Sequence, residues 1–204
     1  MTARPVAVIT GGARGIGRQV AADLLTRGYQ VVIGDLDLER TRRTAVELGG
    51  AVTAVRLDIT DRALVAETVE FVESSIGPIA VWVNNAGIMP TGAFAGQDVS
   101  LARTVVDVDY AALVEVTAAI LPRFLARDAG TLINLGSATG LKPLAGLAVY
   151  SGAKAAVIGF SDALRRELRG TGVRVRVILP TWSPPRWARA SPRRGCRRRS
   201  PRSR

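Results

Sequence analysis

The fold of this 204-residue chain is decided by Thr10-Gly11-Gly12-Ala13-Arg14-Gly15-Ile16-Gly17. This stretch follows an apolar run typical of a buried strand and opens a stretch with helical periodicity. Gly11, Gly15 and Gly17 let the chain turn tightly and let a pyrophosphate approach the backbone. The N-terminal amides of the following helix then point at that phosphate. A glycine-rich turn alone also fits a simple tight turn, but strand, turn and helix together predict a dinucleotide-binding fold.

Beyond this turn, short β-branched runs alternate with helical patterns, which indicates repeated βα units. We therefore predict an α/β fold, a Rossmann-like doubly wound parallel sheet of six strands with helices on both faces. The predicted strands are Val6–Thr10, Gln30–Asp35, Val52–Asp58, Ile79–Asn84, Thr131–Leu135 and Val173–Leu179. The predicted helices are Ile16–Gly28, Leu38–Leu48, Arg62–Ile76, Leu101–Arg127 and Val149–Arg169, with a kink or break near Pro122.

The charge of the chain is unevenly distributed. The net charge is +11, yet residues 1–180 carry 19 basic and 17 acidic residues, whereas residues 181–204 carry nine arginines and no acid. The latter segment contains no Val, Ile or Leu, so we expect it to be a disordered Arg/Pro/Ser-rich tail. We predict one dinucleotide-binding domain, residues 1–180, followed by this tail. Binding of nucleic acid through the tail is an alternative function.

Composition excludes several kinds of site. The chain has no histidine and a single cysteine, Cys196, which excludes histidine-based catalysis, histidine metal ligation and an internal disulfide. No metal site is predicted. No apolar run approaches the ~20 residues that a membrane span needs. Only Met1–Arg4 precede the first strand, which leaves no room for a signal peptide and predicts a cytoplasmic protein with no membrane partner.

Asp35 bears on the choice of dinucleotide. It ends the second predicted strand, where a carboxylate accepts hydrogen bonds from both ribose hydroxyls of an adenosine. The same charge repels a 2′-phosphate, which favours NAD over NADP. Arg14 is a counter-signal, because it lies close enough to meet an extra phosphate. Taken alone, Asp35 also fits a turn or a helix N-terminus.

Four motifs in the right order resemble those of the short-chain dehydrogenase/reductase family. Thr10–Gly17 matches its TGxxxGxG motif, Asn84-Asn85-Ala86-Gly87 its NNAG element, and Tyr150-Ser151-Gly152-Ala153-Lys154 its YxxxK motif. Ser137 stands thirteen residues before Tyr150, as the catalytic serine of the family does. The resemblance covers residues 5–180.

The resemblance implies an NAD(P)-dependent oxidoreductase that moves a hydride between nicotinamide and the carbon of a secondary alcohol or ketone. The site it implies has a catalytic part and a cofactor-binding part. The implied catalytic residues are Ser137, Tyr150, Lys154 and, as a candidate, Asp109. The implied cofactor-binding residues are Gly11, Arg14, Gly15, Ile16, Gly17, Asp35, Asp58, Ile59, Asn84, Ala86, Gly87, Tyr150 and Lys154.

The chemistry of the YxxxK pair can be argued from the residues themselves. Tyr150 and Lys154 are four apart, so on a helix they share one face. A free tyrosine has a pKa of about 10, whereas a general base works best when its pKa lies nearer the working pH. We expect the Lys154 ammonium, in a site shielded by bound cofactor, to lower the pKa of Tyr150. Ser137 is expected to donate a hydrogen bond to the substrate oxygen. A lone Tyr-x-x-x-Lys also fits a pair on a helix surface.

The chain departs from the family pattern in two places. Asp109 stands where the family has an asparagine, and its charge is expected to pair with Lys154 or to disturb the proton relay. After Pro180, Thr181 replaces a glycine and the pattern dissolves. The lid, final helix and seventh strand of the family are missing, so the sixth strand is expected to be a sheet edge. The tail is acid-free and begins abruptly inside a motif, so our hypothesis is a frame-shifted or misassigned reading of the gene.

These departures leave an alternative, a dinucleotide-binding protein without turnover. The segments expected to line the substrate pocket, Ile88–Phe94 and Ala138–Leu147, are mostly small or apolar, which favours an uncharged alcohol or ketone. The resemblance further implies a homodimer or homotetramer through the helices of residues 101–127 and 149–169.

Overall fold

The computed structural model describes residues 4–181. It contains one six-stranded parallel sheet in the order β3-β2-β1-β4-β5-β6, which confirms the predicted doubly wound fold. The strands are β1 Val6–Thr10, β2 Gln30–Asp35, β3 Val52–Arg56, β4 Ile79–Asn84, β5 Gly130–Leu135 and β6 Val173–Ile178. The main helices are α1 Gly15–Thr26, α2 Leu38–Leu48, α3 Arg62–Ser75, α4 Val99–Val106, α5 Ala112–Ala126 and α6 Ala148–Glu167. The expectations for residues 182–204 lie outside the described residues.

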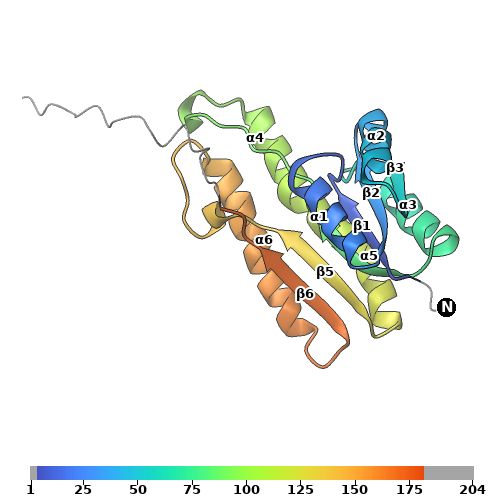
Figure 1. Ribbon diagram of the computed structural model, residues 1–204. Coiled ribbons are helices and arrows are strands. Elements are labelled where there is room, and N and C mark those ends of the chain that lie inside the picture. The colour runs from blue at the N-terminus through green and yellow to red at the C-terminus, as the bar shows by residue number, and fades with distance from the viewer. Residues whose placement is uncertain (1–3, 182–204) are drawn as a thin grey trace, which may run out of the picture.

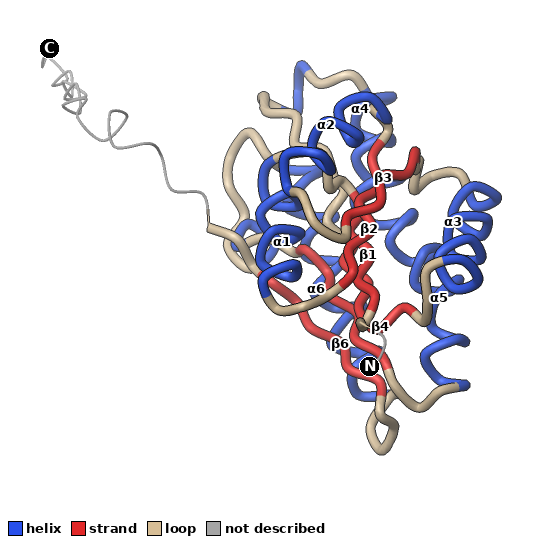
Figure 2. Tube along the Cα trace, turned by 45° about the vertical axis from the view of Figure 1, so that its right-hand side comes forward, coloured by secondary structure: helices blue, strands red, loops and turns tan. Residues whose placement is uncertain are grey.

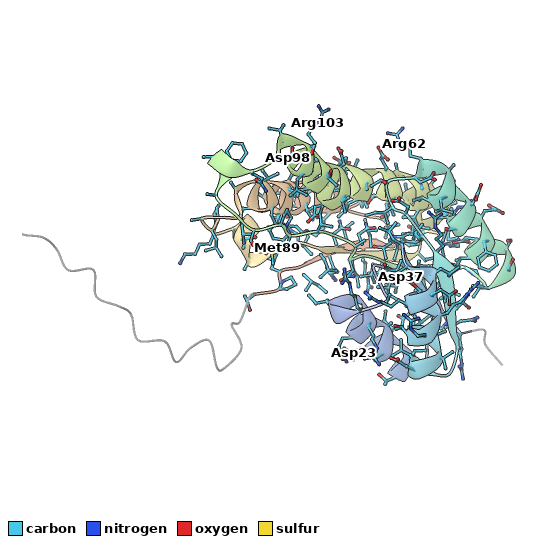
Figure 3. All side chains as sticks on the ribbon, turned by 90° about the horizontal axis from the view of Figure 1, so that it is seen from above. Asp23, Asp37, Arg62, Met89, Asp98 and Arg103 are labelled. Atoms are coloured by element: carbon cyan, nitrogen blue, oxygen red, sulfur yellow. The ribbon has the colours of Figure 1, made fainter. Side chains whose placement is uncertain are left out.

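Helices lie on both faces of the sheet (Figures 1 and 2). On one face, α1 and α2 cover a cluster that contains Ala7, Ile9, Val31 and Ile33. On the other face, α3, α5 and α6 cover a larger cluster built around Trp82 and Phe124. Figure 3 shows Arg62 of α3 and Arg103 of α4 on one side of the sheet and Asp23 of α1 on the other. No helix among the described residues has the length and apolarity needed to cross a membrane.

The long helix predicted over 101–127 is wrong in one respect, because it is interrupted. A π-helical turn, η2 Asp107–Ala111, separates α4 from α5, and the amide of Ala112 donates to the carbonyl of Asp107, five residues back. Pro122, near which we expected a kink or break, lies inside α5, which continues through it without a break. The wide turn places Asp109 inward, where it is buried. The interruption therefore lies where a polar side chain enters the interior.

β6 is the outer strand of the sheet over residues 4–181, as expected. Its Val173 and Val175 are buried against the α6 side, whereas Arg174, Arg176 and Ile178 alternate with them and are exposed. These exposed side chains lie on the face of the sheet opposite α6. This is the same face that α1 and α2 cover over β1 and β2. In Figure 1, β5 and β6 lie in front of α6 with their near face open.

Candidate active site

The glycine turn between β1 and α1 has the geometry that its sequence predicts. Gly11 and Gly15 have φ values of +62° and +54°, which favour glycine. Gly17 has an ordinary φ, but a Cβ there would overlap the carbonyl oxygen of Gly11 and meet Nδ2 of Asn85. The first turn of α1 therefore lies in direct contact with the glycine turn. Because these glycines have no Cβ, space remains beside the backbone.

The start of α1 faces a cavity of about 330 Å³. Arg14 at the N-cap makes no side-chain cap and the first turn carries no acid, so the N-terminal end of the helix is open to an anion. These features fit a dinucleotide pyrophosphate. The cavity brings together eight predicted cofactor residues: Gly11, Arg14, Ile16, Asp35, Asp58, Ile59, Ala86 and Gly87. Gly15 and Gly17 shape the turn and do not line the cavity.

Asp35 has a second contact in this cavity. Its Oδ2 accepts a hydrogen bond from the backbone N–H of Ala13 at 3.2 Å, which ties the glycine turn to the end of β2. Asp58 follows β3, which ends two residues earlier than predicted, at Arg56. Oδ1 of Asp58 accepts from the backbone N–H and the hydroxyl of Thr60 at 2.9 and 2.7 Å. Both carboxylates therefore lie at the carboxyl ends of strands, where ligands of open α/β sheets bind.

Two residues that we did not predict hold the turn in place. Asn85 Nδ2 donates to the carbonyls of Thr10 and Gly11 at 2.9 and 3.0 Å. The Thr10 hydroxyl accepts from the backbone N–H groups of Asn85 and Ala86, both at 3.0 Å. Thr10 belongs to the TGxxxGxG motif and Asn85 to the NNAG element, so the motifs themselves pointed to both residues. They join β1 to β4 at the point where the strand order reverses.

Asn84, which we predicted to bind cofactor, lies elsewhere. Its side chain is buried below the cavity, accepts from Trp82 Nε1 and donates to Asn134 Oδ1, each at 2.9 Å. Asn134 in turn donates to the Ser161 hydroxyl at 2.8 Å. This buried amide chain joins β4, β5 and α6.

The predicted catalytic residues share a second cavity, of about 300 Å³. Asp109, Ser137, Tyr150 and Lys154 all line it. Its wall shares Ile16, Asn85, Gly87 and Ile88 with the first cavity, so the two form one continuous cleft along the carboxyl ends of the strands.

Lys154 is held close to Tyr150 inside this cleft. Its Nζ lies 5.6 Å from the centre of the Tyr150 ring and donates to the carbonyl of Leu135 at 3.1 Å. Lys154 is only 5% exposed, which is rare for a lysine without a specific partner. The Ser137 hydroxyl accepts from the backbone N–H and the hydroxyl of Thr139 at 3.2 and 2.9 Å.

Asp109 is the partner of Lys154. Its Oδ2 lies 3.2 Å from Lys154 Nζ, and its Oδ1 accepts from the backbone N–H of Ile88 at 2.8 Å. A Cβ at Gly87 would come within 3.2 Å of Oδ2, so the glycine gives this carboxylate its space. Burial raises the pKa of Asp109, and the attraction of Lys154 opposes that rise.

The groups around Tyr150 act on its pKa in opposite directions. Burial raises the pKa of Tyr150, a hydrogen bond with Ser137 acts to lower it, and the charge of Asp109 raises it further. Burial therefore has the largest effect on the pKa of Tyr150, and the Asp109 carboxylate, which lies against the Lys154 ammonium, adds to it.

Of the two segments predicted to line the substrate pocket, residues 88–94 contribute Ile88 and Met89 to the cleft, and residues 138–147 contribute nothing to its lining. The backbone N–H of Gly92 donates to the carbonyl of Gly146 at 3.0 Å, which joins the segment after β4 to the segment before α6. The joined segments expose large apolar side chains: Met89, Phe94, Leu141 and Leu144.

The chain is similar to known proteins in sequence and in fold. The family model described as short chain dehydrogenase matches residues 5–187. The ketoacyl reductase HetN of a Nostoc species is 32% identical over 176 residues, which are 85% of this chain and 61% of that protein. The chain therefore spans about three fifths of the length of that relative.

Two solved structures are similar to the fold. Serine dehydrogenase from Escherichia coli has a TM-score of 0.82 and 33% identity, and the match covers 86% of this chain and 82% of that one. A closed form of serine dehydrogenase complexed with NADP+ has the same TM-score and identity and is covered over 71% of its chain.

Proposed function

The chain belongs to the short-chain dehydrogenase family, and from this premise we propose that it is an NAD-dependent oxidoreductase acting on a secondary alcohol or a ketone. One observation carries the proposal. The glycine turn and the Ser137, Tyr150 and Lys154 side chains line a single continuous cleft. A bound dinucleotide supplies hydride transfer at its nicotinamide, and the chain supplies orientation and proton transfer.

Each side chain has a role in this proposal. Tyr150 gives a proton to the carbonyl oxygen during reduction and takes it back during oxidation. Ser137 donates a hydrogen bond to the same oxygen, where negative charge develops. Lys154, already fixed by Leu135 and Asp109, holds the cofactor beside Tyr150. The open start of α1 and Gly11 hold the pyrophosphate.

We propose NAD rather than NADP as the preferred cofactor. Asp35 lines the cofactor cavity, and its carboxylate disfavours a 2′-phosphate. Arg14 lines the same cavity and acts in the opposite sense. One relative binds NADP+, so both dinucleotides belong in the test. Ile16, Ile88 and Met89 in the wall of the cleft favour an uncharged substrate, and one relative is a ketoacyl reductase.

Tyr150→Phe tests the assignment of the proton donor. The variant is expected to lose about 10²–10⁴-fold in ketone reduction, because the phenyl ring fills the same space without a transferable proton. NADH binding, followed by its fluorescence, is expected to weaken far less than turnover, because the glycine turn, Asp35 and Lys154 remain to hold the dinucleotide. Tyr29→Phe, at the opposite end of the sheet, is the matched control.

Three results would contradict the proposal in different ways. Equal rates for Tyr150→Phe and the parent would remove Tyr150 from the chemistry. Tight NADH binding without turnover on any ketone would favour the dinucleotide-binding alternative. Absence of binding to either nicotinamide dinucleotide would reject both.

A further inference from the structure

Asp109 and Lys154 form an ion pair away from solvent. Their side chains are 0% and 6% exposed, and Oδ2 of Asp109 has no hydrogen-bond partner besides the 3.2 Å ionic contact. Removing two charges from water is costly, and the cost is offset only when they face each other closely. The pair therefore fixes both charges in a defined arrangement.

The pair is also part of the surroundings of Tyr150. Of the residues lining the cavity with the predicted catalytic side chains, only Asp109, Tyr150 and Lys154 are titratable. Lys154 comes from α6, the same helix as Tyr150, and Asp109 comes from η2. The segment after β5 contributes the neutral Ser137, and the segment after β4 contributes Asn85, Gly87, Ile88 and Met89, which are uncharged.

The net charge beside the Tyr150 ring is therefore close to zero. An unpaired ammonium 5.6 Å from the ring would stabilise a phenolate. A carboxylate in contact with that ammonium removes most of this effect, because the two fields have opposite sign. An asparagine at position 109 would keep the shape and leave the ammonium unopposed.

We propose that Asp109 is a positioning residue that neutralises Lys154 and so keeps the proton on Tyr150 well into alkaline solution. In reduction, the carbonyl carbon accepts the hydride of NADH and the carbonyl oxygen takes the Tyr150 proton, which gives the alcohol, NAD+ and a phenolate that regains a proton from water. In oxidation, the phenolate must form first. Reduction then holds its rate across neutral pH, and oxidation rises only at high pH. This inference rests on the proposed function.

Asp109→Asn tests the inference directly. The Tyr150 phenolate is followed by its ultraviolet absorbance as pH rises, and the matching Tyr150→Phe protein is subtracted to remove the signals of Tyr29 and Tyr110. The midpoint in Asp109→Asn is expected to fall by about one pH unit. The rising limb of alcohol oxidation and the falling limb of ketone reduction are expected to move down by the same amount. Asp107→Asn removes an equal charge from an exposed neighbour and is expected to change nothing.

A second pair of variants covers the case in which Asp109→Asn fails to fold around an unpaired lysine. Lys154→Gln and Asp109→Asn/Lys154→Gln differ only in the carboxylate, so the single variant is expected to have the higher phenolate midpoint. Equal midpoints in both comparisons would overturn the inference. The absorbance titration needs no turnover, so it separates this inference from the proposed function. A shifted midpoint in the variants, with no activity in the parent protein, would reject the oxidoreductase proposal. It would leave intact the role of Asp109 in keeping the proton on Tyr150.

Discussion

Asp35 is a single side chain on which the choice between two cofactors depends. Its carboxylate lines the cavity at the end of β2 and accepts from the Ala13 amide. A carboxylate in this position accepts hydrogen bonds from the ribose hydroxyls and repels a phosphate on the same ribose. Arg14, from the turn itself, lines the same cavity and remains after the acid is removed.

Asp35→Ser is therefore expected to shift the preference toward NADPH. The ratio of the Kd for NADPH to that for NADH is expected to fall at least about tenfold, because removing one unfavourable charge contact is worth about 1.4 kcal/mol. Fluorescence titration of both reduced dinucleotides measures the ratio. Asp23→Ser, which removes an exposed charge from α1, serves as the control. An unchanged ratio in Asp35→Ser would show that this carboxylate does not discriminate.

The residue scale also shows where sequence reasoning was limited. The motifs identified the residues that meet in the cleft, because their spacing and order are specific. They did not distinguish Asn84, the last residue of β4, from Asn85 after it, because the motif carries no information on which of the two side chains faces the cavity. The effect of burial on the pKa of Tyr150 could not be predicted from the motif, because burial depends on how segments distant in the sequence pack together.

At the scale of elements, the alternation of strands and helices was enough to predict every strand, with bounds correct to within two residues. The interruption at η2 was not predicted, because the helical apolar periodicity continues on both sides of the turn. The one additional residue of the π turn changes that periodicity too little to be detected in the sequence. Pro122 is the stronger signal in the sequence, but α5 accommodates it.

The buried amide chain that joins β4, β5 and α6 gives a prediction at this scale. Asn134 accepts from Asn84 and donates to Ser161, so Asn134→Ala leaves the buried Asn84 Nδ2 without an acceptor and removes the bond that Ser161 accepts, while Ser161 keeps its bond to the Val157 carbonyl. We expect a loss of about 2–5 kcal/mol in the free energy of unfolding by urea. Thr131→Ala, a half-buried position on the same strand, is the control. Equal stability of the two variants would mean that the amide chain contributes little.

At the scale of the whole molecule, a cofactor that binds only the folded chain must stabilise it. NADH at a hundred times its Kd is expected to add about 2.7 kcal/mol and to raise Tm by about 5–10 °C. Gly17→Val is expected to abolish the rise, because its side chain would occupy the space beside the Gly11 carbonyl.

Thermal unfolding with and without NADH measures this effect. Gly159→Ala, on an open face of α6, is expected to keep the full rise. A rise that persists in Gly17→Val would place the dinucleotide somewhere other than the glycine turn.

The π turn at Asp107–Ala111 makes the charge balance of the cleft depend on chain length as well as on residue type. In a regular α-helix, each position is rotated by about 100° from the next. Deleting one residue from this turn would convert it to ordinary helix and swing the aspartate side chain around the axis, away from the lysine. A chain shorter by one residue in this turn, with Asp109 and Lys154 both kept, would then leave the ammonium to act on the phenol alone.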